Sequence, residues 1–158
     1  MLKEQRPDLG IHTVLAFMNT DLIFEEENDK PEHLQIIGGF GKRHWICVHY
    51  ARNHLNIYDS LRRGNFERLN PHERNYIVAR YPDLRVCDIT FKIVQRQPDN
   101  ESCGLYACAF ATSIASYTDP ERIPYSRNTN LLRENLAKIL EDSVLREFPL
   151  SPDNLLYA

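Results

Sequence analysis

The chain has 158 residues, of which 42% are apolar and 26% charged, a composition typical of one globular domain. An aromatic content of 10% excludes intrinsic disorder over the whole chain. The 19 basic and 22 acidic residues give a net charge of −3 without an extended basic patch, so we expect no nucleic-acid partner. The longest apolar run, Leu105–Ala111, is too short to cross a membrane, so we expect no membrane partner.

The chain contains four cysteines. Because the N-terminal residues lack the apolar region of a signal peptide, we expect reduced thiols and an intracellular location, nuclear or cytoplasmic. Free cysteine is among the most buried residue types, so Cys47, Cys87 and Cys108 are interpreted as core residues. Cys103 stands in a different local pattern.

Strand patterns dominate the first half of the chain. Runs rich in β-branched and aromatic residues predict strands at Leu34–Ile37, His44–Tyr50 and Leu55–Asp59. The Gly-rich segment Gly38–Arg43 is followed by a strand and not by a helix, which favours a hairpin connection over a phosphate-binding loop. A turn at Arg52-Asn53 leads into the third strand.

Helices are the main elements of the second half. Asn70–Arg80 is a predicted helix with Asn as N-cap and Pro at the first helical position, and the alternating Val86–Val94 predicts a strand. Cys103–Tyr117 is small and apolar nearly all round, which predicts a buried central helix with Ser102 as candidate N-cap. A final helix is expected at about Leu131–Leu145. This order predicts an α+β domain with an antiparallel or mixed sheet.

The start of the buried helix is where we expect chemistry. A helix N-terminus favours a thiolate, which makes Cys103 a candidate nucleophile. A nucleophilic thiol needs a base and a group that orients the base. His44 begins one strand and Asp59 ends the strand expected beside it, so a hairpin would bring the two together. The Gln97 amide and the backbone N–H of Cys103 are candidate donors to an oxyanion.

Four short motifs then resemble a known family. They are His44-Trp45, Tyr58-Asp59-Ser60-Leu61, Gln97-Pro98 and Ser102-Cys103-Gly104-Leu105-Tyr106. Their order and gaps resemble the catalytic domain of the SUMO-specific, or ubiquitin-like-protein-specific, cysteine proteases, whose fold and catalytic order adenovirus endopeptidase shares. The resemblance runs from about Leu34 to Tyr117, and Asn130–Pro149 resembles the helical tail of transposon-related animal members.

The resemblance implies a papain-like α+β fold in permuted order, formed by residues 1–158 as a single catalytic domain. It implies Cys103 as nucleophile, His44 as general base, Asp59 as the residue that orients the imidazole, and Gln97 as oxyanion donor. Trp45 matches the aromatic that packs over the substrate's tail. The implied activity is thiol proteolysis or isopeptide cleavage after a Gly-Gly tail. It needs no cofactor, and its partner is a ubiquitin-like protein (SUMO, NEDD8 or ubiquitin) or its conjugates.

The sequence departs from the family pattern at two places. Ser102 stands where many relatives have Asp before the nucleophile. The chain has one Trp, and it starts 43 residues before His44. We therefore expect the family's N-terminal segment, with a Trp-Leu-Asn-Asp-like motif whose Trp forms the other wall of the substrate tunnel, to be shortened or absent.

Three alternatives stay open. His44, Cys47 and His49 cluster in the sequence with Cys87 available from another strand, but paired ligands of the Cys-x₂-Cys kind are missing, so we expect no metal site. A protease that has lost turnover would act as a binding module for ubiquitin-like proteins. A Cys-His-Asp set also serves acyltransferases.

Overall fold

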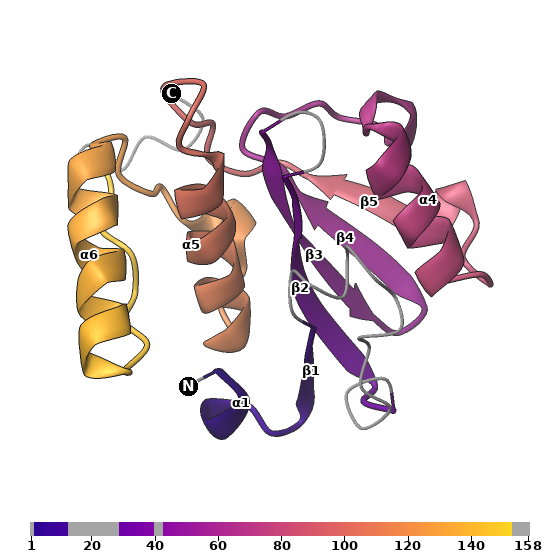
Figure 1. Ribbon diagram of the computed structural model, residues 1–158, viewed down its shortest axis with the longest axis horizontal. Coiled ribbons are helices and arrows are strands. Elements are labelled where there is room, and N and C mark those ends of the chain that lie inside the picture. The colour runs from indigo at the N-terminus through magenta and orange to yellow at the C-terminus, as the bar shows by residue number, and fades with distance from the viewer. Residues whose placement is uncertain (1, 13–28, 40–42, 153–158) are drawn as a thin grey trace.

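The computed structural model describes residues 2–12, 29–39 and 43–152, and these are built around a five-stranded sheet (Figure 1). The strands are β1 (Leu9–His12), β2 (Glu32–Gly38), β3 (Trp45–Ala51), β4 (His54–Tyr58) and β5 (Ile89–Lys92), in the spatial order β1-β2-β3-β4-β5. The pairs β2–β3 and β3–β4 are antiparallel, whereas β1 and β5 run parallel to their neighbours. The predicted α+β class with a mixed sheet is confirmed.

Helices cover both faces of this sheet. α5 (Cys103–Ala115) packs on β2 and β3, and α6 (Thr129–Asp142) lies on the side of α5 that faces away from the sheet (Figure 1). α4 (Pro71–Arg80) covers the opposite face. The other helical elements of the described residues are α1 (Leu2–Gln5) and the 3₁₀ turns Phe66–Arg68, Val86–Asp88 and Pro120–Arg122. The predicted central helix is thus confirmed, and it starts at Cys103.

The alternation of side chains along β3 divides the apolar residues between two cores. Cys47 points toward α5, where it packs in one cluster with Phe110. Ile46 and Val48 point the other way and pack with Ile77 of α4. Burying a side chain of this size contributes about 1.5–3 kcal/mol. With packing on both faces, β3 is a rigid support for the residue that precedes it.

Two glycines bring the end of β2 close to the start of β3. Gly38 pairs with Trp45 and has a φ of +146°, and a Cβ there would lie 2.0 Å from the carbonyl oxygen of His44. The Gly39 amide donates a 3.1 Å hydrogen bond to that same oxygen. Glycine is required because any side chain would push the two segments apart. The antiparallel β2–β3 pairing agrees with the predicted hairpin, although residues 40–42 of its turn lie outside the described residues.

The predicted caps differ in outcome. Asn70 caps α4 as predicted: its side chain accepts from the Glu73 amide at 2.9 Å, and the Glu73 carboxylate accepts from the Asn70 amide at 3.0 Å. Ser102 occupies the N-cap position of α5 but makes no side-chain cap bond. Its hydroxyl donates instead to Asp99 at 2.7 Å, so Ser102 closes the preceding loop and does not cap the helix.

The prediction for Val86–Val94 was partly wrong. Only Ile89–Lys92 forms the strand, and Val86–Asp88 is a 3₁₀ turn. The Asp88 carboxylate accepts a 2.9 Å hydrogen bond from the Arg85 amide, which bends the backbone out of the extended form. Cys87 lies in this turn and is exposed, so its interpretation as a core residue was wrong.

Candidate active site

His44 and Asp59 meet because of the β3–β4 hairpin. Arg52 and Asn53 take φ values of +52° and +58°, the left-handed conformation of a tight two-residue turn. Antiparallel pairing then brings the residue before β3 beside the residue after β4. His44 Nε2 lies 2.7 Å from Asp59 Oδ1, and the two residues are 7% and 2% exposed. The predicted imidazole–carboxylate contact is present and shielded from water.

Cys103 lies close to His44. It is the first residue of α5, is buried, and interacts with the His44 side chain closely enough to change the pKa of both groups. Nε2 of His44 faces Asp59. The Cys103 Sγ also lies 3.8 Å from the carbonyl oxygen of Arg43. The fold therefore aligns carboxylate, imidazole and thiol from three separate segments.

The protonation of these groups follows from their contacts. Burial lowers the pKa of His44, but its hydrogen bonds to Asp59 and Cys103 outweigh this and raise the pKa to about 9. Burial raises the pKa of Asp59, yet the His44 hydrogen bond and the charge of Arg63 bring it down to about 2. Burial also raises the pKa of Cys103, and the hydrogen bond with His44 more than offsets that, for a net lowering. This arrangement favours a thiolate–imidazolium pair at neutral pH.

The other buried thiols behave in the opposite way. Burial in apolar surroundings raises the pKa of both Cys47 and Cys108. All four cysteines are free thiols, and Cys47 packs in the core as predicted, with Cys108 partly buried against it. Of these residues, Cys103 combines a lowered pKa with a histidine partner.

Gln97 is held in a fixed conformation close to the Asp59 turn. Ser60 Oγ donates to the side-chain Oε1 of Gln97 at 2.5 Å, and the backbone N–H of Gln97 donates to the Ser60 carbonyl at 3.1 Å. Gln97 Nε2 donates one proton to the carbonyl of Asp99 at 2.7 Å. The carboxylate of Asp99 accepts from the backbone N–H of Ser102 at 2.8 Å. This loop thus connects the Gln97 amide with the residue before Cys103.

Trp45 lies between two glycines beside the thiol. A Cβ on Gly39 would approach the Trp45 ring to 2.9 Å, and a Cβ on Gly104 would lie 3.7 Å from Trp45 Cδ1. The indole is half-buried and packs at the margin of the core that contains α5. An aromatic wall therefore stands next to the first turn of the nucleophile helix.

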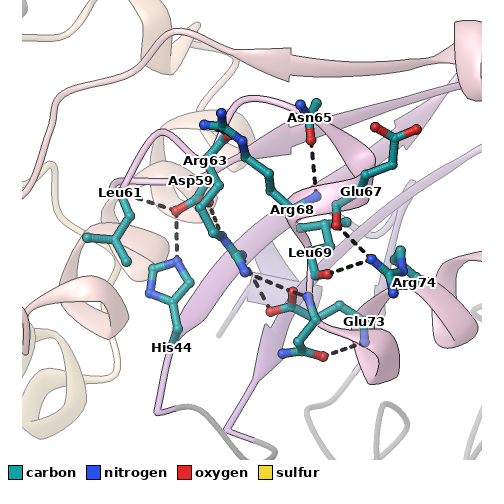
Figure 2. A network of polar contacts seen from close by, with 11 residues as sticks. His44, Asp59, Leu61, Arg63, Asn65, Glu67, Arg68, Leu69, Glu73 and Arg74 are labelled. Carbon is teal, nitrogen blue, oxygen red and sulfur yellow. Dashed lines mark hydrogen bonds and ion pairs between the residues drawn. The ribbon is translucent and has the colours of Figure 1, made fainter.

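The sequence interpretation missed two residues behind Asp59. Arg63 Nε donates to Asp59 Oδ2 at 2.7 Å, and Arg63 Nη1 donates to Glu73 Oε2 at 3.1 Å (Figure 2). Part of this was visible in the sequence, since Asn-Pro-x-Glu is a capping-box pattern that places Glu73 at the N-terminus of α4. The contact between Glu73 and Arg63 depends on the tertiary fold and has no sequence signature.

The residues of the zinc alternative are not brought together. Cys47 is buried in the core, whereas Cys87 lies on an exposed turn and His44 faces Asp59. Over residues 2–12, 29–39 and 43–152, no group of three or more His, Cys, Asp and Glu side chains is placed to hold a metal ion. In the same part of the chain, none of the helices has the length and apolar character needed to span a membrane.

Comparisons with known proteins concern the fold and the family of the chain. A search of curated proteins finds no match. The solved structure of the SUMO protease Ulp1 with its catalytic cysteine oxidised to a sulfenic acid matches with a TM-score of 0.64 and 14% identity, over 92% of this chain and 74% of that one. The Ulp1 protease domain in complex with Smt3, the yeast ortholog of SUMO, matches with a TM-score of 0.61 and 13% identity, over 92% and 73% of the two chains.

A third match is the Ulp1-like SUMO protease catalytic domain of Chaetomium thermophilum, with a TM-score of 0.62 and 19% identity over 96% of this chain and 67% of that one. These three likenesses show a shared fold. The model of the Ulp1 protease family, C-terminal catalytic domain, matches residues 25–144. This chain therefore belongs to the Ulp1 protease family and is a cysteine protease.

Proposed function

We propose that this protease cleaves after the Gly-Gly tail of a ubiquitin-like protein of the SUMO type, with Cys103 as nucleophile. The observation that carries the proposal is the buried line from Asp59 through His44, at 2.7 Å, to the thiol of Cys103 at the start of α5. A Ulp1 domain of similar fold was solved in complex with the yeast ortholog of SUMO, which supports the substrate class.

The proposed reaction starts from the thiolate of Cys103 and the imidazolium of His44. The thiolate attacks the carbonyl carbon of the last glycine and forms a C–S bond, while the carbonyl π electrons move onto oxygen. When the intermediate collapses, the C–N bond breaks and His44 gives its proton to the leaving amine. His44, now neutral, takes a proton from water, whose oxygen attacks the thioester carbonyl. The C–S bond then breaks, the acyl group leaves as a carboxylic acid that loses its proton to solvent, and the thiolate–imidazolium pair is restored.

Gln97 and the backbone N–H of Cys103 are the proposed donors to the oxyanion. One proton of Gln97 Nε2 is used by the Asp99 carbonyl, which leaves the second for the substrate. Fixed donors of this kind stabilise a developing negative charge without reorganising during the reaction, and one of them is worth about 3–4 kcal/mol. The anchoring of Gln97 by Ser60 fits this role.

Trp45 is the proposed contact for the substrate's tail. Its indole stands beside Gly104, next to the nucleophile. A peptide that passes a flat aromatic wall close to a thiol must lack bulky side chains, and glycine is the residue without a Cβ. This steric requirement favours a Gly-Gly tail over an ordinary peptide.

The test uses ubiquitin-like proteins whose tails end in an electrophile. We expect an adduct with a SUMO probe, weighed by mass spectrometry, that is lost in Cys103→Ala and kept in Cys87→Ser, which removes the exposed thiol. An adduct with a NEDD8 or ubiquitin probe, and none with SUMO, would contradict the assignment of SUMO as substrate. Absence of any adduct in a folded sample that binds SUMO would favour a binding module, and transfer of an acyl group to an added amine in preference to water would favour an acyltransferase.

A further inference from the structure

Behind the Asp59 carboxylate lies a partly buried ion pair, Arg63–Glu73, that none of the proposed chemical steps uses. We propose that Arg63 and Glu73 are positioning residues of this protease, which hold the Asp59 carboxylate in line with Nε2 of His44. The inference rests on the proposed role of Asp59.

The first observation is how fully the Asp59 carboxylate is restrained. Its Oδ1 atom accepts from His44 at 2.7 Å and from the Leu61 amide at 2.9 Å. Its Oδ2 atom accepts from Arg63 Nε at 2.7 Å (Figure 2). A carboxylate bound at both oxygens cannot rotate without breaking a charge-assisted hydrogen bond. Arg63 therefore fixes the plane of Asp59, and with it the direction of the bond to His44.

The second observation is what fixes Arg63. Its Nη1 and Nη2 atoms lie 3.1 and 3.5 Å from the two oxygens of Glu73, a side chain with no exposed surface. Glu73 is in turn the capping-box residue of α4 and accepts from the Asn70 amide at 3.0 Å. Because Ile77 anchors α4 in the core below the sheet, the chain of contacts leads from a packed helix to the imidazole.

The chemistry of the guanidinium suits this position. Its Nε and Nη protons lie in one plane and point in fixed directions, so one side chain can bind two carboxylates at once. A lysine in place of Arg63 would reach one of them. The charges of Arg63 and Glu73 also cancel, so that Asp59 keeps its negative charge for His44. Within the described part of the chain, the charged or titrating groups that act on His44 are Asp59, Arg63 and Cys103, with Glu73 behind Arg63.

The decisive variant is Arg63→Met with Glu73→Gln. Removing Arg63 alone would leave Glu73 as an unpaired buried charge and endanger the fold. The double variant removes both charges, and Gln serves the capping box as Glu does. Its folding is checked by thermal unfolding before any activity is compared.

Three measurements follow on the folded double variant. We expect kcat to fall about ten- to a hundredfold with KM unchanged, because the loss is one of alignment and not of substrate contact. The pKa of His44, followed by NMR titration of its ring, falls toward about 6.5 as the hydrogen bond to Asp59 loosens. Alkylation of Cys103 by iodoacetamide at neutral pH slows, which needs no ubiquitin-like substrate.

A control removes a second arginine that pairs with a carboxylate, Arg6→Met with Asp8→Asn; Arg6 is buried and Asp8 is exposed. Arg6 donates to Asp8 at 2.8 and 2.7 Å and to the carbonyl of Ala115, at the far end of α5 from Cys103. This control leaves kcat and the pKa of His44 unchanged. A folded double variant at Arg63 and Glu73 that behaves in the same way overturns the inference, as does a rise in the pKa of His44, which would mean simple charge repulsion. A wild-type Cys103 no more reactive than an ordinary thiol overturns the proposed function itself.

Discussion

Histidines lie at both ends of the sheet, and their hydrogen-bond partners carry opposite charges at the two ends. Before β3, His44 faces the carboxylate of Asp59 at 2.7 Å. At the other end of the sheet, His12 and His33 lie 3.0 and 3.3 Å from a guanidinium nitrogen of Arg80. Because arginine only donates hydrogen bonds, those two ring nitrogens accept through their lone pairs.

The two ends of the sheet also differ in the groups that surround their histidines. His33 stacks on Tyr50, and Tyr50 stacks on Tyr81 with ring centroids 4.8 Å apart. A cavity of about 1000 Å³ opens over these rings, and no cysteine lines it. The comparison teaches that the charge of its partner and a nearby thiol set His44 apart from the other buried histidines, and these two features support its proposed role in proton transfer. The cavity alone does not identify the site.

The substitution Asp59→Asn should have the largest effect on activity, because it removes the charge that distinguishes the His44 end of the sheet. It removes the negative charge from the proposed catalytic end and leaves an amide that favours the wrong tautomer of His44. Asparagine in this role lowers kcat on the order of 10⁴-fold in a serine protease, and we expect a loss of similar order here. Steady-state kinetics with the reactive ubiquitin-like substrate measures it, and a loss below about tenfold would argue against the assignment of Asp59.

The pH dependence should be the next largest effect. We expect kcat/KM to fall about tenfold per pH unit above pH ~9, where His44 loses its proton. It also falls on the acid side, where the thiolate of Cys103 is protonated.

The free energy of unfolding depends on pH through the same groups. The raised pKa of His44 contributes its full stabilisation below pH 6.5, and this contribution is lost as the pH rises through about 9. The lowered pKa of Asp59 contributes above 3.8 and is lost as the pH falls toward about 2. Activity and thermal unfolding measured from pH 3 to 10 test both signs, and a basic limb near pH ~6.5 would contradict the pairing with Asp59.

The smallest effect is expected at the opposite end of the sheet. Arg80→Met removes the hydrogen bonds to His12 and His33 and the contact of the guanidinium with the Tyr81 ring. We expect a loss of about 1–2 kcal/mol in the free energy of unfolding, measured by urea denaturation, with kcat/KM within about twofold of wild type. A large loss of activity in this variant would mean that the two ends are coupled.

Much of the fold could be predicted because local chemistry encodes it. The Asn-Pro start of α4, the turn at Arg52-Asn53 and the small apolar run of α5 each favour one structure whatever surrounds them. The strand β1 escaped prediction because its four residues carry too short a pattern, and it is defined by pairing with β2. The alternating pattern of Val86–Asp88 predicts a strand, but the Asp88 side chain accepts a hydrogen bond from the Arg85 amide and a 3₁₀ turn forms instead.

The residues of the candidate site likewise fall into those that local sequence predicts and those that depend on the tertiary fold. Its proposed reacting groups stand at element ends that the sequence marks, and the structure brings His44, Asp59 and Cys103 together as expected. The supporting contacts behind them could not be predicted. The bond from Arg63 to Glu73 spans ten positions and closes when α4 packs on the sheet, and Ser60 meets Gln97 across 37 positions.

The order of these groups along the chain has a consequence for synthesis. His44 and Asp59 are 15 positions apart in one hairpin, whereas the Cys103 thiol contacts the His44–Asp59 end from 60 positions beyond Arg43. A chain that leaves the ribosome at about 5–20 residues per second exposes the hairpin several seconds before α5. The thiol acquires its imidazole partner when α5 docks, so until then the nascent chain carries an ordinary, unactivated cysteine.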